Sequence, residues 1–264
     1  VITYKINSKH FDLASSVQKA FNEIGVDFVK NLHKKNNSQN LCLAGGVAQN
    51  IVMNQNIYLK SGFKNFFVQP ASHDAGISLG AALLAANQKG KIFRKTIFNP
   101  CLGASFSNKH IKSVLDTYQI PYSYKKNICY STAKIISDGY VVGWFQGKTE
   151  FGPRALGSRS ILADPRVKEM KNIVNKKIKF RESFRPFAPS ILTEEFNKFF
   201  SHSPKNPYMC FSANVRQEVR KIIPAVTHID GSARPQAVSK SLYPLFWELI
   251  HNFNKITKIP ILLN

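Results

Sequence analysis

The segment 143–160, GWFQGKTEFGPRALGSRS, contains residue types that bind phosphate groups. It has four glycines, a proline, two arginines and a lysine, so bare backbone amides and fixed positive charge lie close together. Farther along, Lys179, Arg181 and Arg185 stand just before a rigid PFAP stretch, and Arg234 is followed directly by a proline. Arginine offers a planar fork to phosphate or carboxylate, and a rigid backbone lowers the entropic cost of using it. These residues predict an anion site, with Arg154 and Arg159 supplied by the first segment.

An ordinary structural role is the alternative for this region. Between residues 148 and 185 there are eleven basic side chains and only four carboxylates, which leaves most of the cations without an acidic partner. Solvated lysines need no partner, however, so the structural alternative stays open. The sequence shows no GxSxG motif and no cysteine with a histidine nearby in the chain. A reaction driven by positioning and charge neutralisation, as in phosphoryl or nucleotidyl transfer, fits these residues better.

Two further loops follow short apolar runs. In AGGVAQN (44–50), Gly45 and Gly46 let a ligand approach the backbone and precede a helix start, so together with Asn50 they suit a nucleotide; a tight turn with close helix packing is the alternative. In PASHDAG (70–76), His73 and Asp74 suit a divalent metal, while Asp74 as a helix cap is the alternative. Neither motif decides between its two interpretations.

The spacing of apolar residues predicts the elements that position these motifs. Strands over 41–44 and 66–68 alternate with helices over 47–59 and 77–86, which predicts a parallel α/β sheet. An amphipathic helix over 11–32 precedes them, with an inward face formed by Phe11, Val17, Phe21, Ile24, Phe28 and Leu32. The segment 87–100 loses this periodicity and is the expected linker. The second domain is expected to contain a strand over 140–145 and helices over 167–177, 193–200 and 242–256, the last with Leu245, Phe246, Leu249, Ile250 and Phe253 on one side.

Composition narrows the class of protein. The chain has 264 residues, of which 44% are hydrophobic, and no apolar run of about 18 residues, so we expect a globular protein without a membrane span. There is no signal-peptide pattern at the start, which favours the cytoplasm. The net charge of +22 suits nucleic acid, an acidic surface or small anions, but the lysines are scattered as on a solvated surface. Four dispersed cysteines without a CxxC pair are expected to be reduced thiols.

Read together, the motifs resemble the O-carbamoyltransferase family that includes nodulation-factor and antibiotic carbamoyltransferases. LAGGVAQNIVMN and PASHDAGISLGAALLA resemble the end of that family's Kae1-like domain, which has the actin/Hsp70-type ATPase fold. GWFQGKTEFGPRALGSRSILADPR, NKKIKFRESFRPFAPSIL, DGSARPQAV and TKIPILLN resemble its YrdC-like domain. The resemblance implies an α/β fold with the C-terminal part of a Kae1-like domain over 1–92 and a YrdC-like domain over 93–264, truncated at its C-terminus.

The resemblance also implies a reaction at two sites. The YrdC-like domain would form carbamoyl-adenylate from carbamoyl phosphate and ATP, and the Kae1-like domain would pass the carbamoyl group to an acceptor hydroxyl of a sugar, lipo-oligosaccharide or antibiotic. Carried over residue by residue, the catalytic, carbamoyl-phosphate-binding set is Lys179, Arg185 and Arg234. Arg154, Arg159 and Arg181 would be their substrate-binding neighbours, and Gly45, Gly46 and Asn50 would hold the nucleotide.

The resemblance places a metal ion, iron or similar, at Asp74, and magnesium with the ATP. The family's two histidine ligands, spaced HxxxH, belong to an N-terminal segment that this sequence does not contain, and His73 replaces a residue that is usually small. The family also continues beyond Asn264 with TSFN. We therefore expect residues 1–264 alone to lack transfer activity; carbamoylation of an acceptor by this chain would contradict that expectation.

Three other kinds of function share some of these features. Enzymes of tRNA threonylcarbamoylation use Kae1-like and YrdC-like parts as separate proteins, and the net charge of +22 gives this alternative some support. Fusion in one chain argues against it, and the scattered lysines argue against a nucleic-acid partner. Hydrogenase-maturation carbamoyltransferases carry paired-cysteine zinc modules, which this sequence lacks. A non-catalytic module that binds ATP as a signal stays open.

Overall fold

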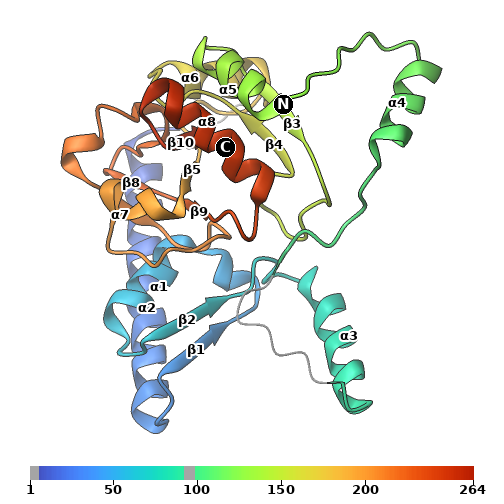
Figure 1. The fold of residues 1–264 in the computed structure, drawn as a ribbon. Helices are drawn as coiled ribbons and strands as arrows, with labels where there is room; N and C mark the ends of the chain where they lie inside the picture. Colours follow the sequence, from blue (N-terminus) through green and yellow to red (C-terminus); the bar gives the residue numbers. More distant parts are fainter. Residues whose placement is uncertain (1–5, 92–98) are drawn as a thin grey trace.

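The first part of the chain forms a small parallel sheet flanked by helices (Figure 1). The computed structural model describes residues 6–91 and 99–264. The elements up to residue 91 are α1 (Ser8–Lys35), β1 (Asn40–Leu43), the 3-10 helix η1 (Gly46–Gln49), α2 (Ile51–Lys60), β2 (Asn65–Val68) and α3 (Gly76–Gln88). Strands β1 and β2 pair in parallel, with Asn40 opposite Asn65. The expected order of strand, glycine turn, helix and strand is confirmed.

The inward face predicted for α1 was wrong. Five of its six residues are 39–72% exposed, and Phe21 is partly buried. The exposed ones are Phe11, Val17, Ile24, Phe28 and Leu32. Instead, Val26 and Val29 are buried, in a cluster with Met53 and Ile57 of α2 and Leu41 of β1. Helix α1 has 28 residues and the strand β1 beside it has only four, so the sheet can cover only a small part of the helix surface. The part that becomes buried is the part that contacts α2 and β1.

The second part of the chain contains three more small sheets. In chain order its elements are α4 (Asn108–Thr117), α5 (Ile128–Ser137), β3 (Val142–Phe145), β4 (Arg159–Leu162), α6 (Met170–Lys177), β5 (Pro189–Leu192), η2 (Thr193–Glu195), α7 (Phe196–Phe199), β6 (Phe200–Ser201), β7 (Ala213–Val215), η3 (Gln217–Val219), η4 (Pro224–Val226), β8 (Ser232–Ala233), β9 (Gln236–Val238), α8 (Pro244–Thr257) and β10 (Ile261–Leu263). The sheets are β3–β4, β10–β5–β9 and β6–β7–β8.

The protein is therefore mixed α/β, and the parallel pairing predicted for the strands of the first part is confirmed by β1 and β2. Parallel pairing holds for β1–β2 and β5–β9, whereas the other four strand pairs are antiparallel. Strands β3 and β4 pair antiparallel because the glycine-rich loop between them turns the chain straight back. The helix expected over 193–200 is a 3-10 turn and a single helical turn, after which Phe200 pairs with Val215. The helix expected from Val167 begins at Met170.

One hydrophobic core joins the two parts of the chain. Ala48 and Val68, from the first part, belong to the same buried cluster as Leu156 and the α8 residues Phe246 and Leu249. Helix α8 packs on α5 (Figure 1) and buries the expected face, apart from Leu245, which is 42% exposed. The expected linker over 87–100 overlaps the end of α3, and the domain boundary expected between residues 92 and 93 lies outside the described residues.

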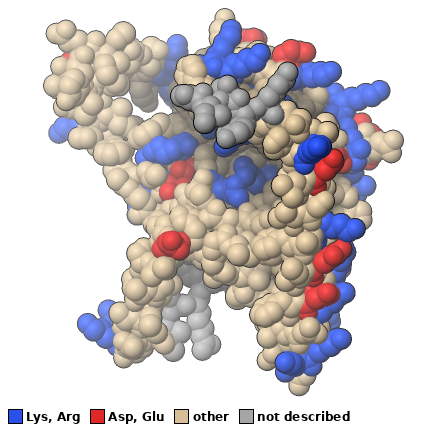
Figure 2. Space-filling model, turned by 180° about the vertical axis from the view of Figure 1, so that it is seen from behind, with Lys and Arg blue, Asp and Glu red and all other residues tan. Residues whose placement is uncertain are grey.

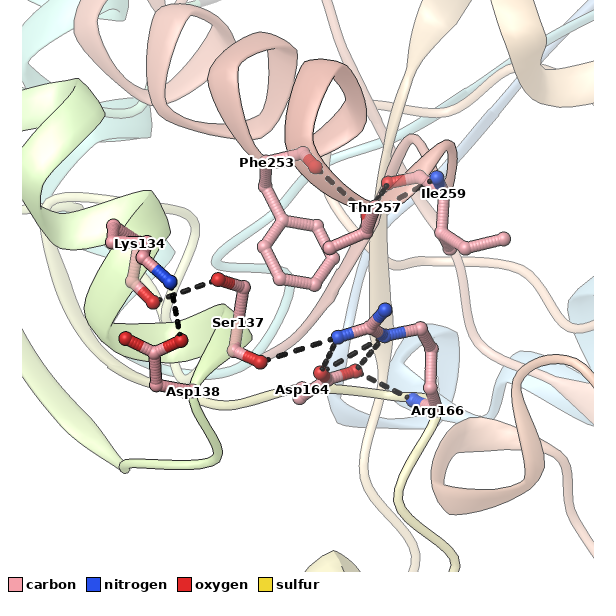
Figure 3. Close-up of polar contacts among 8 residues, drawn as sticks. All are labelled: Lys134, Ser137, Asp138, Asp164, Arg166, Phe253, Thr257 and Ile259. Atoms are coloured by element: carbon pink, nitrogen blue, oxygen red, sulfur yellow. Dashed lines mark hydrogen bonds and ion pairs between the residues drawn. The ribbon is translucent and has the colours of Figure 1, made fainter.

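Two polar contacts reinforce this packing. Asn54, which is fully buried, donates from Nδ2 to the Ala48 and Cys210 carbonyl oxygens, each at 2.8 Å, and so ties α2 to the second part. Figure 3 shows the other contact, in which Arg166 lies flat against the buried carboxylate of Asp164, with Nη2 2.6 Å from Oδ2. The same guanidinium donates to the Ser137 carbonyl at the end of α5, at 3.3 Å. Arg166 is thus a structural cation. Among the described residues no helix is both long and apolar enough to cross a membrane.

Candidate functional site

Six basic side chains line a cavity of about 490 Å³. All six basic residues expected to bind phosphate or substrate border it. They are Arg154, Arg159, Lys179, Arg181, Arg185 and Arg234, together with apolar and neutral residues that include His228 and Asn264. Figure 2 shows lysine and arginine side chains in a hollow near the middle of the face drawn there. Cations that are more than 70 residues apart in the sequence therefore share one cavity.

The loop between β3 and β4 is held by Glu150. Its Oε1 accepts backbone N–H groups from Leu156 at 2.8 Å, Ser158 at 2.6 Å and Arg159 at 3.2 Å. Within this loop Gly157 has φ +103°, and a Cβ there would stand 2.2 Å from the Phe246 ring. Only glycine fits so close to α8 with this backbone conformation. Glu150, one of the few carboxylates of the region, thus organises the backbone and forms no ion pair among the described residues.

Backbone carbonyl groups orient the two arginines of this loop. Arg159 donates to the Gln146 and Ser158 carbonyl oxygens, both at 2.8 Å, and its guanidinium lies 3.5 Å from the centre of the Phe145 ring. Arg154 donates to the Gln49 carbonyl at 3.2 Å, so it also connects the cavity to the turn after β1. Neutral carbonyls fix the direction of a guanidinium and leave its full charge available to a ligand.

The segment after α6 contributes the next three cations. Arg181 donates to Asn175 Oδ1 at 2.7 Å, and its guanidinium lies 4.8 Å from the Phe187 ring centre. Burial, with the nearby Arg181 charge as the second cause, lowers the pKa of Lys179. Arg185 differs from the others because it is half exposed and pairs with Glu182 at 2.8 Å. It is the one member of the six with a carboxylate partner among the described residues.

Arg234 is the most constrained of these cations. Its Nε is buried and has no hydrogen-bond partner within the described chain, although part of the side chain still opens on the cavity. Burial, followed by repulsion from Arg154 and Arg181, lowers its pKa to about 9. Burial also lowers the pKa of Arg154. Buried charges are normally paired, so an unpaired guanidinium beside other cations indicates a cavity that receives an anion.

Sequence reasoning missed two neutral residues of the cavity. His228 lies two residues before the DGSARP stretch, with Nδ1 3.1 Å from Ser232 Oγ, and burial lowers its pKa. Asn264 follows β10 and also borders the cavity. The sequence contains only weak clues to them. His228 is a histidine next to a recognised motif, and Asn264 is a polar residue at the end of an apolar strand. Cys210, whose pKa burial raises to about 12, is a neutral thiol near Arg154 and Arg234 and offers no nucleophile at neutral pH.

A second cavity, of about 280 Å³, lies at the carboxyl ends of β1 and β2. Gly45, His73 and Asp74 line it together. Gly46 begins η1, whereas Asn50 caps α2 by accepting the Met53 N–H at 3.0 Å and exchanges hydrogen bonds with Gln18. The amide of Asn50 is therefore engaged in structure. Helix α3 starts at Gly76 without a side-chain cap, so the cap interpretation of Asp74 was wrong.

The described residues do not complete a metal site around Asp74. Nowhere in residues 6–91 and 99–264 do three histidine, cysteine or acidic side chains gather closely enough to hold an ion. His73 Nδ1 accepts the Ala75 N–H at 3.2 Å, which engages one of its two ring nitrogens. All four cysteines are free, as expected. Asp74 with His73 thus supplies at most part of a coordination sphere.

Two known sequence families match the chain. The carbamoyltransferase N-terminus matches residues 2–83, and the carbamoyltransferase C-terminus matches residues 133–264. Nodulation protein NolNO of Sinorhizobium fredii is 41% identical, covering 97% of this chain and 39% of its own length. Nodulation protein NolO of Bradyrhizobium diazoefficiens is 40% identical over 97% of this chain and 48% of its own length. For nodulation protein U of Rhizobium tropici the identity is 36%, over 88% of this chain and 39% of that protein.

Fold and cavity define a mixed α/β protein with one cavity lined by six basic side chains. The sequence matches make the identification specific: the chain belongs to the carbamoyltransferase family. It spans less than half the length of these curated relatives.

Proposed function

We propose that this chain takes part in ATP-dependent O-carbamoyl transfer, and that its 490 Å³ cavity binds carbamoyl phosphate and the phosphates of ATP. The observation that carries the proposal is the buried Nε of Arg234, which has no hydrogen-bond partner among the described residues and stands beside five other cations in one cavity. Membership of the carbamoyltransferase family supplies the reaction class. Six positive side chains around one cavity favour a small anionic substrate, because such a ligand can contact several of them at once.

In the proposed reaction, carbamoyl phosphate, ATP and one water give carbamoyl-adenylate, phosphate and pyrophosphate. The carbamoyl–phosphate linkage breaks, with water completing the phosphate, and a carbamate oxygen forms a bond to the α-phosphorus of ATP as pyrophosphate leaves. An acceptor hydroxyl then takes the carbamoyl group, loses its proton and releases AMP. Negative charge is redistributed or released in each step, and fixed positive side chains can stabilise that charge in the transition state.

The cations divide by their surroundings. Arg234 and Lys179, whose pKa values burial lowers, have no acidic partner within the described chain and suit the doubly charged phosphate group. Arg185, half exposed and paired with Glu182, would exchange that partner for a ligand oxygen. Arg154 and Arg159, held by carbonyl groups, would contact the triphosphate. These assignments follow from burial and partner type.

The first part of the chain would belong to the acceptor step. We propose that residues 1–92 are the end of a Kae1-like domain and residues 93–264 a YrdC-like domain, with the cavity of Gly45 and Asp74 facing the nucleotide that carries the carbamoyl group. Among the described residues Asp74 and His73 would supply only part of a metal site there. A sugar, a lipo-oligosaccharide or an antibiotic scaffold would provide the acceptor hydroxyl.

Isotope exchange between pyrophosphate and ATP tests the adenylation step. We expect exchange by residues 1–264 to depend on carbamoyl phosphate and to fall at least tenfold in Arg234→Met. The matched control is Arg216→Met, because the Arg216 side chain bonds the Asn197 carbonyl, and Arg216 does not line the cavity. Exchange without carbamoyl phosphate, or none at all from a folded chain that binds ATP, would contradict the proposal and favour a non-catalytic nucleotide-binding module.

A further inference from the structure

Phe180 lies at the mouth of the cationic cavity, between two residues that line it. Lys179 and Arg181 both border the cavity, and neighbouring Cα atoms are about 3.8 Å apart, so the backbone of Phe180 stays close to the rim. Phe180 is 83% exposed, and Phe184, which directly precedes the cavity-lining Arg185, is 56% exposed. Neither ring belongs to a buried cluster of the described residues. The rim therefore carries two exposed aromatic rings next to the positive charge.

The backbone of Phe180 has a conformation that residues other than glycine rarely adopt. Its φ is +46°, in the left-handed region, where a turn just after a helix normally has glycine. Hydrogen bonds on both sides hold this turn in place: the Lys179 N–H donates to the Val174 carbonyl at 2.9 Å. The Arg181 N–H donates to the Asn175 carbonyl at 3.1 Å. A phenylalanine that is both strained and exposed adds nothing to the core, which favours a role for its ring in contacting a ligand.

The interior of the cavity offers little free aromatic surface for a nucleotide base. Phe187 is the only phenyl ring among the described residues that line it; this ring is 4% exposed and lies 4.8 Å from the Arg181 guanidinium. The His228 ring is engaged through Nδ1, which is 3.1 Å from Ser232 Oγ. A nucleotide whose phosphates lie among the cations is therefore expected to place its base at the rim, where Phe180 is exposed.

We propose that the base of ATP stacks on the ring of Phe180 at the mouth of the cavity, while the triphosphate lies among the cations inside. The inference rests on the proposed function and adds the residue that binds the base end of the nucleotide. A base stacked on an aromatic side chain strengthens binding about ten- to a hundredfold. The hydrogen bonds that hold the backbone on both sides of Phe180 reduce the ordering that binding requires. The contribution of Phe180 is thus separable from that of the phosphate-binding cations.

Calorimetric titration of residues 1–264 with ATP and with inorganic tripolyphosphate, both in the presence of magnesium, tests this assignment. In Phe180→Gly the affinity for ATP should fall about tenfold or more, while the affinity for tripolyphosphate changes less than about twofold. Glycine accepts the left-handed backbone, so this variant should melt no lower than the wild-type chain. Gln119→Gly is the matched control, because Gln119 also has a positive φ, +53°, and does not line the cavity. It should leave both affinities unchanged.

Phe180→Trp gives a direct measure of stacking. The new indole should keep most of the affinity for ATP, because it also offers a flat aromatic face. ATP should quench its fluorescence by stacking on it, beyond any change seen in the wild-type chain, whereas tripolyphosphate should not. Equal quenching by both ligands, or none with bound ATP, would contradict the assignment.

The possible outcomes separate the two proposals. An equal loss of affinity for ATP and tripolyphosphate in Phe180→Gly would show that Phe180 supports the phosphate-binding cavity, and the stacking role would be wrong. An unchanged affinity for ATP would also overturn that role and leave the anion cavity intact. If Phe180→Gly does not fold, Phe180→Leu, which keeps an apolar side chain without the ring, must show the selective loss. If neither ligand binds the folded wild-type chain, the proposed function itself is wrong.

Discussion

Replacing Arg234 with methionine should stabilise the protein and at the same time destroy the proposed anion site. The fall in the pKa of Arg234 from 12.5 to about 9 means that the folded protein disfavours the charged form. At 1.36 kcal/mol per pKa unit this amounts to about 5 kcal/mol. Part of the side chain still meets the cavity, which reduces the penalty to about 2 kcal/mol, within the range seen when buried charges are replaced by apolar residues. Methionine keeps much of the volume and removes the charge.

We expect the melting temperature of Arg234→Met to rise by about 5 °C in a buffer without phosphate or sulfate. Affinity for inorganic phosphate should fall about ten- to a hundredfold, because a charge-assisted hydrogen bond is lost. The Arg166→Met variant should behave in the opposite way. It leaves the buried Asp164 carboxylate unpaired, so the melting temperature should fall while the affinity for phosphate stays unchanged. Calorimetry measures both quantities on each variant. If Arg234→Met melts lower than wild type, Arg234 supports the fold, and the reasoning from its missing partner is wrong.

Three further predictions test the cavity and the core. Phosphate affinity should decline between pH 8 and pH 10, because the lowered pKa of Arg234, about 9, makes it lose its proton in that range. Titration at pH 8 and pH 10, where phosphate is the dianion, checks this, and equal affinities would contradict it. Glu150→Ala should lower the free energy of unfolding in urea by about 2–4 kcal/mol, because three backbone N–H groups lose their acceptor. Glu150→Gln keeps one side-chain oxygen and should lower it by only about 1 kcal/mol. Similar losses in both variants would count against this role of Glu150. Asn54→Ala should lower the free energy of unfolding by about 2–4 kcal/mol, because two carbonyl groups lose their buried donor. Unfolding should remain a single transition, since Asn54 and the shared core join the two parts of the chain. Two separate unfolding transitions in the wild-type chain would show that the parts unfold independently.

Local elements were predictable wherever short-range spacing alone decides them. The strand, turn and helix order around Gly45 and the long helix α8 followed from apolar spacing, because such a pattern can bury its residues in only one way. The face of α1 was not predictable. It carries two apolar stripes, and which stripe is covered depends on where α2 and β1 come to lie. The linker over 87–100 was predicted from a loss of periodicity, whereas the core that joins the two parts depends on contacts between distant residues.

The sequence by itself determined which side chains supply charge: glycine- and proline-rich turns bearing Arg154, Arg159, Lys179, Arg185 and Arg234 indicated an anion site before any fold was known. Only the tertiary structure decided that these cations border one cavity, and that the buried Nε of Arg234 has no partner among the described residues. The physical reason is the range of the interactions. Residue type and local backbone preference are set within a few positions along the chain, whereas burial, convergence of charge and the direction of a hydrogen bond depend on residues that only folding brings together.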